Sequence, residues 1–250
     1  MDRRFWDQIA PSFKDDVFDV VGLDQQHRVV RHIRSLASAK HDAIDFGCGI
    51  GRHLPLLADS FASVCAVDIS EECLHVARQA CRGFEAVEYL AADLADEDLP
   101  LPQAHFGLCI NVLIMPSHEI RTAILATMSR HLRAGGHLLV VVPSLESVLY
   151  AHRRLIQWNR REGGSAAEAW AENEAYLGEP DGGLAAGIVC LNGTRTKHYL
   201  REELEALFGR VALRVQAIEK VTYPWSTEFT APPAWMKAPY PWDWLIVLKK

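Results

Sequence analysis

The chain has 250 residues, 49% of them hydrophobic and 23% charged, which predicts one globular domain with room for an insertion. Its net charge of −6 and the lack of a long basic run argue against a nucleic-acid partner with an extended surface. No apolar signal core follows the first residues and no run of 18 apolar residues occurs, so we expect a cytoplasmic protein without a membrane contact. The cysteines form no C-x-x-C pair, so we expect free thiols and no metal site (Cys48, Cys65, Cys73, Cys81, Cys109 and Cys190).

The N-terminal part is predicted to be helical over residues 4–9 and 14–36, with Asp24 a candidate N-cap inside the second segment. From residue 42 to residue 143, strands and helices then alternate, which predicts a parallel sheet with helices on both faces. Continuous apolar runs such as 138–142 are typical of strands buried on both faces. The predicted helices of this part are 52–60, 70–81 and 117–133.

Residues 43–52 (Ala-Ile-Asp-Phe-Gly-Cys-Gly-Ile-Gly-Arg) predict a strand, a tight glycine turn and the start of a helix. Gly47, Gly49 and Gly51 supply the positive φ values or the free space that a ligand against bare backbone requires. A dinucleotide-binding fingerprint, G-x-G-x-x-G, would have its third glycine one residue later. Asp45 precedes this turn by two residues, where a carboxylate would repel a pyrophosphate and suit a ligand with an ammonium group.

Two more predicted strands end in an acid, Val64–Asp68 and Tyr89–Asp93. A carboxylate at such a strand end can accept hydrogen bonds from both hydroxyls of a ribose. A fourth strand is predicted over Phe106–Leu113, and residues 132–142 (Leu-Arg-Ala-Gly-Gly-His-Leu-Leu-Val-Val-Val) predict a helix end, a glycine turn and a fifth strand.

Together these segments resemble the class I S-adenosylmethionine (SAM)-dependent methyltransferases of the small-molecule type, over roughly residues 40–145. The resemblance implies a Rossmann-like three-layer α/β sandwich with a mostly parallel seven-stranded sheet, an antiparallel last strand, and a helical and hairpin cap insertion. It implies SAM as cofactor, S-adenosylhomocysteine (SAH) as product, and transfer of a methyl group to an oxygen, nitrogen or carbon atom of a small or medium-sized molecule.

The resemblance also implies roles for residues in cofactor binding. Asp45, with the backbone of Gly47 and Gly49, would hold the methionine amino group, and Arg52 would meet the carboxylate or remain a solvent-exposed helix residue. Asp68 would accept the ribose hydroxyls, and Asp93 would meet the adenine amino group unless Asp96 or Asp98 takes that place. Further cofactor-binding residues implied in this way are Cys48, Gly51, Ile69, Leu94, Asn111 and Val112.

The N-terminal segment Phe5–Phe13 is similar to an aromatic-Asp-x-x-Ala-x-x-aromatic segment that closes over SAM in many small-molecule methyltransferases. Trp6 stands where tyrosine is common in that segment, so a hydroxyl is missing. The alternative is an apolar N-terminal helix that packs on the core.

After Pro143 the sequence predicts a helix over 145–161, a short helix over 165–177 and a hairpin over 188–199 around Asn192-Gly193. A helix over 200–208 and closing strands over 210–218 and 243–249 follow, and the resemblance implies that the two strands form an antiparallel pair. We therefore divide the single domain into N-terminal helices (1–40), a SAM-binding core (41–144), a cap insertion (145–197) and a C-terminal part (198–250) with an aromatic loop (219–242). The two extra segments either cap the substrate end of the site or serve as packing or a dimer surface.

Methyl transfer from SAM requires that the protein align the acceptor atom with the methyl group and exclude water, and it requires no protein nucleophile. A fixed set of catalytic residues is therefore not expected in the sequence. His118 is the candidate general base. His198, Tyr199 and Trp225 are the candidate substrate residues, and the first two are also alternative bases. A small-molecule substrate is the expected partner, and a homodimer is compatible with the sequence.

Three other functions stay open at this point. A nicotinamide-dependent oxidoreductase is disfavoured by the G-x-G-x-G spacing and by Asp45. A protein or RNA methyltransferase would use a basic rim, and a non-catalytic SAM-binding or scaffold module would bind cofactor without turnover. The rim would consist of Arg153, Arg154, Arg160, Arg161 and Lys197.

Overall fold

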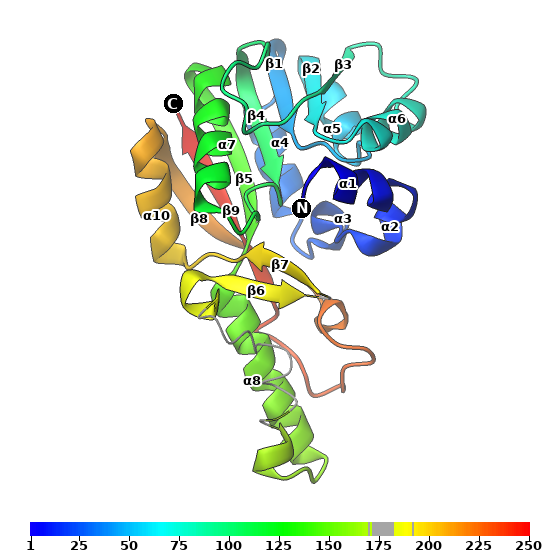
Figure 1. Ribbon diagram of the computed structural model, residues 1–250, viewed down its shortest axis with the longest axis vertical. Helices are drawn as coiled ribbons and strands as arrows, with labels where there is room; N and C mark the ends of the chain where they lie inside the picture. Colours follow the sequence, from blue (N-terminus) through cyan, green and yellow to red (C-terminus); the bar gives the residue numbers. More distant parts are fainter. Residues whose placement is uncertain (170, 172–182, 192) are drawn as a thin grey trace.

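A seven-stranded sheet organises the chain, and the structure, a computed structural model, describes residues 1–169, 171, 183–191 and 193–250 (Figure 1). The strand order is β3-β2-β1-β4-β5-β9-β8. Strands β1 to β5 run parallel to one another, and β9 is antiparallel to both β5 and β8. This confirms the predicted α/β sheet with an antiparallel last strand. The strands are β1 (Ser38–Phe46), β2 (Phe61–Asp68), β3 (Val87–Ala91), β4 (Ala104–Ile110), β5 (Leu132–Pro143), β8 (Arg214–Thr222) and β9 (Trp242–Lys249).

Helices cover both faces of the sheet (Figure 1). Most of them begin with an N-cap side chain that accepts a hydrogen bond from an otherwise unpaired backbone N–H of the first turn. Ser70 does so for α6, Ser117 for α7 and Ser144 for α8. The helices are α1 (Arg3–Ile9), α2 (Phe13–Asp16), α3 (Val20–Leu23), α4 (Arg28–Leu36), α5 (Leu54–Ala58), α6 (Glu71–Ala80), α7 (His118–His131), α8 (Leu145–Arg161) and α10 (Arg201–Phe208). Among the described residues, none of the helices has the length and apolarity needed to cross a membrane.

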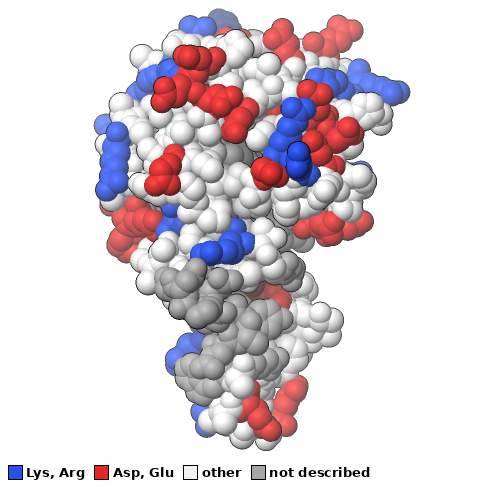
Figure 2. Space-filling view, viewed as in Figure 1, with Lys and Arg blue, Asp and Glu red and all other residues white. Residues whose placement is uncertain are grey.

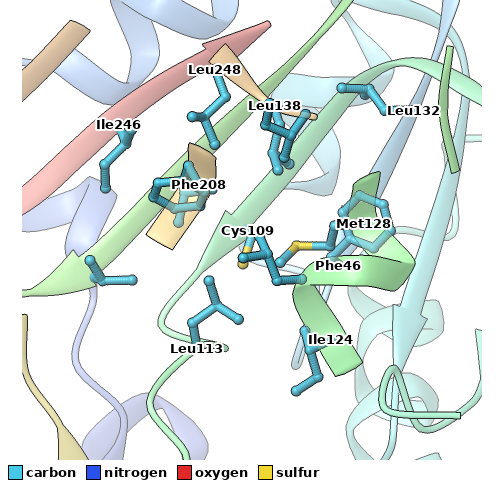
Figure 3. Close-up of a cluster of buried hydrophobic side chains, with 14 of the residues drawn as sticks. Phe46, Cys109, Leu113, Ile124, Met128, Leu132, Leu138, Phe208, Ile246 and Leu248 are labelled. Carbon is cyan, nitrogen blue, oxygen red and sulfur yellow. The ribbon is translucent and has the colours of Figure 1, made fainter. Parts of the chain in front are cut away.

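The core consists of two large apolar clusters, one on each face of the sheet. One cluster joins β4, β5 and β9 to α7 and α10, as Cys109, Leu138, Met128 and Phe208 illustrate (Figure 3). The residues of 138–142 are all fully buried, which explains why this strand is apolar without alternation. Each such aliphatic side chain contributes about 1.5–3 kcal/mol by leaving water.

The predicted N-terminal helix over 14–36 is wrong as a continuous element, because the chain turns twice within it. Asp19 caps the short helix α3. Asp24 then accepts hydrogen bonds from the N–H groups of Gln26 and Val29, and His27 adopts a left-handed φ of 51°. Helix α4 therefore starts only at Arg28, and Asp24 caps its first turn from outside the formal N-cap position.

The first closing strand runs over 214–222 and not over the predicted 210–218. Residues Gly209–Val211 form a 3₁₀ turn after α10, and Ala212 follows with a left-handed φ of 52°, so the strand starts later. The aromatic loop accordingly begins at Tyr223. The predicted helices 52–60 and 117–133 shorten to α5 and α7.

A projection formed by α8 and residues 223–241 extends from the sheet (Figure 1). Ala151, Trp225 and Met236 form its buried centre, and aromatic side chains pack around them (Tyr150, Trp158, Phe229, Trp235 and Tyr240). The hairpin of β6 (Ile188–Leu191) and β7 (Thr194–Lys197) is present as predicted, although Asn192 of its turn lies outside the described residues. Most of the predicted helix 165–177 also lies outside them.

Candidate functional site

The glycine turn after β1 is built so that side chains would not fit. Gly47, Gly49 and Gly51 have φ values of 77°, 53° and 81°, which L-residues rarely adopt. A Cβ atom on Gly49 would lie 2.7 Å from the Phe13 ring, and one on Gly47 would collide with Val112. The N–H groups of Gly47 and Cys48 both bond to the carbonyl of Val67, so the turn is fixed to the end of β2.

Asp45, next to this turn, is a buried carboxyl group with one oxygen that has no partner. Its side chain is 1% exposed, and Oδ2 forms no hydrogen bond. Burial, with a smaller contribution from Asp68, raises the pKa of Asp45 to about 8. A buried polar atom without a partner costs free energy, so this position fits a cation that comes from outside the chain.

Asp68 lies at the end of the neighbouring strand β2 and is held by the backbone. Its Oδ2 accepts the N–H of Gly49 at 2.8 Å, and its Oδ1 accepts the N–H of Ser70 at 2.9 Å. Burial raises the pKa of Asp68, and these two hydrogen bonds work against that rise. The structure therefore brings Asp45, Asp68 and the glycine turn together at the carboxyl edge of the sheet, where α/β proteins bind ligands.

The residues after β3 are buried or only partly exposed to solvent. Asp93 is half-buried, and its Oδ1 accepts the N–H of Ala95 at 2.9 Å. Leu94 packs into the core beneath, with 6% exposure. Ile69, after β2, is half-buried.

Asn111 and Val112 follow β4, and Val112 contacts the same turn. Asn111 has a left-handed φ of 54°, and its buried Oδ1 has no hydrogen-bond partner. Val112 touches the glycine turn at Gly47. A second acceptor without a partner thus lies directly after β4, the strand next to β1.

The N-terminal segment covers the glycine turn through Phe13, and its helix α1 packs against α6 (Figure 1). The ring of Trp6 lies 6.3 Å from that of Phe13, which sits on Gly49. The Ser70 hydroxyl donates to Asp7 at 2.6 Å. Neither a role for Phe13 nor the Asp7–Ser70 bond was predicted from the sequence, although Phe13 and Asp7 both lie in the aromatic N-terminal segment Phe5–Phe13.

Arg52 also holds this segment. Its guanidinium donates to the carbonyls of Val17 at 2.8 Å, Lys14 at 3.1 Å and Phe13 at 3.3 Å. It also lies over the Phe13 ring, 5.4 Å from the centroid. The structure therefore gives Arg52 three backbone partners in the N-terminal segment, and its contact with the cofactor carboxylate stays a prediction.

The candidate base and substrate residues occupy unlike environments. His118, the first residue of α7, is exposed. His198 is 2% exposed with an unpartnered Nδ1, and burial, then the Lys197 charge, lowers its pKa to about 4. Tyr199 is 1% exposed, and its hydroxyl donates to the Leu113 carbonyl at 2.6 Å. Trp225 is buried in the projection, where Nε1 donates to the Lys237 carbonyl at 3.2 Å.

Comparison with known proteins agrees with this geometry. The profile of the methyltransferase domain family matches residues 43–136. The demethylmenaquinone methyltransferase of Tropheryma whipplei (strain Twist) is 29% identical over 139 residues, which are 55% of this chain and 57% of that protein. The chain thus spans about half the length of the curated relatives it matches.

Solved structures share the whole fold. N-methyltransferase NodS from Bradyrhizobium japonicum WM9, in complex with SAH, has a TM-score of 0.62 at 11% identity, covering 99% of this chain and 97% of NodS. The 1,6-didemethyltoxoflavin-N1-methyltransferase of Burkholderia thailandensis has a TM-score of 0.60 at 14% identity, covering 99% and 86%. Residues 43–136 therefore match the methyltransferase domain family, and the chain as a whole shares the fold of these solved methyltransferases.

Proposed function

We propose that this chain transfers a methyl group from SAM to a small or medium-sized molecule. The observation that carries the proposal is the buried oxygen Oδ2 of Asp45, which has no hydrogen-bond partner, beside the three-glycine turn. The α-ammonium group of SAM is a cation that would satisfy this oxygen, whereas the pyrophosphate of a nicotinamide dinucleotide would be repelled.

The site residues would mainly bind and align. SAM, when bound, supplies a methyl carbon that is already activated by its sulfonium. Asp45 and the backbone of the glycine turn would hold the amino group, and Asp68 would accept ribose hydroxyls with the lone pairs that its backbone bonds leave free. Trp6 and Phe13 would exclude water from this end, which strengthens every polar contact inside.

The acceptor would bind on the side of the projection. Two structural neighbours are named as N-methyltransferases, which supports a small-molecule acceptor for this chain without fixing the attacking atom. His198 is a candidate for contact with a buried acceptor, because it is buried and its Nδ1 has no hydrogen-bond partner. His118 is exposed and would need an acceptor that reaches the start of α7.

A macromolecular acceptor receives less support. Lys197 of the suggested basic rim is 3% exposed and paired with Glu203 at 2.6 Å, so it is not a surface charge. Arg154 and Arg161 stack on the Trp235 ring, at 5.0 and 4.1 Å from its centroid. On the face seen in Figure 2, basic and acidic side chains are interspersed. We further propose a cytoplasmic location, the domain division given above, and no nucleic-acid partner.

The proposal is tested by SAM affinity in matched acid-to-alanine variants. Asp45→Ala should abolish measurable SAM binding, while Asp59→Ala, which removes an exposed acid just after α5, should bind as the unmodified chain does. A panel of small amine, phenol and carboxylate acceptors, followed by SAH release, then identifies the substrate class. Equal affinity in both variants would remove Asp45 from the site.

A further inference from the structure

The loop between β4 and α7 (residues 111–117) is held by hydrogen bonds to consecutive carbonyl groups. Tyr199 Oη donates to the carbonyl of Leu113 at 2.6 Å, and the backbone N–H of Lys197 donates to that of Ile114 at 2.8 Å. The Arg121 guanidinium donates to the next two carbonyls, those of Met115 and Pro116. Loop carbonyls usually bond to water, so four fixed by protein donors indicate a loop whose position matters.

Tyr199 is itself fixed at three points. Its N–H bonds to the Pro143 carbonyl at 2.9 Å, and its own carbonyl accepts the N–H of Leu145 at 3.0 Å. Its ring is fully buried in the core cluster on the α7 face. The hydroxyl thus has a defined position relative to the end of β5 and the start of α8.

The other end of the loop meets the glycine turn. The N–H of Asn111 bonds to the carbonyl of Val141 at 3.0 Å, and Val112 fills the space over Gly47. Leu113, whose carbonyl Tyr199 holds, directly follows these two residues. A shift of the Leu113 peptide would therefore move Val112 against the turn.

We propose that Tyr199 is a positioning residue for cofactor binding, whose hydroxyl fixes the Leu113 carbonyl and so keeps Asn111 and Val112 against the glycine turn. This inference rests on the proposed function. It replaces a direct contact between Tyr199 and the acceptor, because the hydroxyl already has a partner inside the protein. The same proposal gives the hairpin of β6 and β7 a supporting role for the cofactor site, because the N–H of Lys197 at its end holds the Ile114 carbonyl of the loop.

A second buried tyrosine provides a matched control. Tyr223 is 3% exposed, and its hydroxyl also donates one hydrogen bond, to Asp243 Oδ2 at 2.9 Å, but this bond does not involve the loop. Both Tyr199→Phe and Tyr223→Phe remove one buried hydroxyl, and both should lower the melting temperature. Only Tyr199→Phe should weaken SAH binding, on the order of tenfold, whereas Tyr223→Phe should stay within about twofold.

A third variant separates stability from positioning within the hairpin. Lys197→Met removes the ion pair with Glu203, the hydrogen bond to the Ala186 carbonyl and the charge over the Tyr199 ring, but it keeps the backbone N–H that holds Ile114 and leaves the Tyr199 hydroxyl in place. It should lower the melting temperature while SAH affinity stays within about twofold of the unmodified chain. A purely structural role for Tyr199 predicts instead that affinity follows stability in all three variants.

Hydrogen–deuterium exchange of the unmodified chain tests the proposal without any variant, so a variant that fails to fold leaves it testable. SAH should slow exchange at the amides of both Asn111 and Lys197. Protection that is confined to the glycine turn, or unchanged affinity in folded Tyr199→Phe, would overturn the positioning role. If the unmodified chain binds neither SAM nor SAH, the proposed function itself fails, which is a different result.

Discussion

Asp45→Asn should stabilise the ligand-free protein, and more so as the pH rises. The carboxyl group is buried, its Oδ2 has no partner, and burial raises its pKa to about 8. Asparagine has nearly the same shape and never ionises. The substitution therefore removes the cost of ionising a buried acid while keeping the packing.

The magnitude follows from proton linkage. The raised pKa means that the folded state holds this proton more tightly than the unfolded state, whose carboxyl titrates near 4. The ionisation cost is therefore absent below about pH 4, grows as the pH rises, and levels off above the folded pKa of about 8. Between pH 5 and pH 8 the cost grows by an amount on the order of 3 kcal/mol, because one pH unit corresponds to about 1.4 kcal/mol.

Urea unfolding at pH 5, 6, 7 and 8 measures this difference directly. The free energy of unfolding of Asp45→Asn minus that of the unmodified chain should increase across the series, and the subtraction removes the other titrating groups. Asp59→Asn, at an exposed position, is the matched control for the loss of one carboxyl group elsewhere in the chain. A flat difference for Asp45→Asn would refute the reasoning, because the carboxyl would then titrate alike in both states.

Three further predictions concern the same site. At pH 7, SAM binding should release most of one proton from Asp45, because the arriving ammonium group lowers the carboxyl pKa of about 8. Calorimetry in buffers of different ionisation enthalpy should detect this proton release, and the Asp45→Asn variant should release no proton. Gly49→Ala should cost about 1–3 kcal/mol in unfolding free energy and weaken SAM binding, because φ is 53° and the new Cβ would lie 2.7 Å from the Phe13 ring; unchanged melting and affinity would contradict the geometry of the turn. Arg52→Ala should speed tryptic cleavage after Lys14 by loosening the N-terminal segment, whereas equal cleavage rates would show that other contacts hold it.

The sheet could be predicted from the sequence because its signals are local and repeated. Strands such as 138–142 are apolar throughout since both of their faces are buried, and the glycine turn carries its own φ requirements. Asp45 and Asp68 lie close together because parallel strands end at one edge, which the alternation of strands and helices already implied.

The rest depended on contacts between distant residues. The breaks before α4 come from the left-handed φ of His27 and from the hydrogen bonds of Asp24, which no helical periodicity encodes. The Asp7–Ser70 bond joins residues 63 apart, and Phe13 meets Gly49 only once the N-terminal segment folds over the turn. Similarly, nothing near Tyr199 in the sequence indicates that its hydroxyl holds the Leu113 carbonyl, 86 residues away.

The central claim is that this site binds SAM, and calorimetric titration of the unmodified chain tests it most directly. SAM and SAH are titrated separately, with NADH as the control ligand. Saturable binding of SAM and SAH without binding of NADH is the predicted result. Binding of NADH alone would contradict the account and indicate an oxidoreductase, and binding of none of the three would indicate a scaffold that has lost the cofactor.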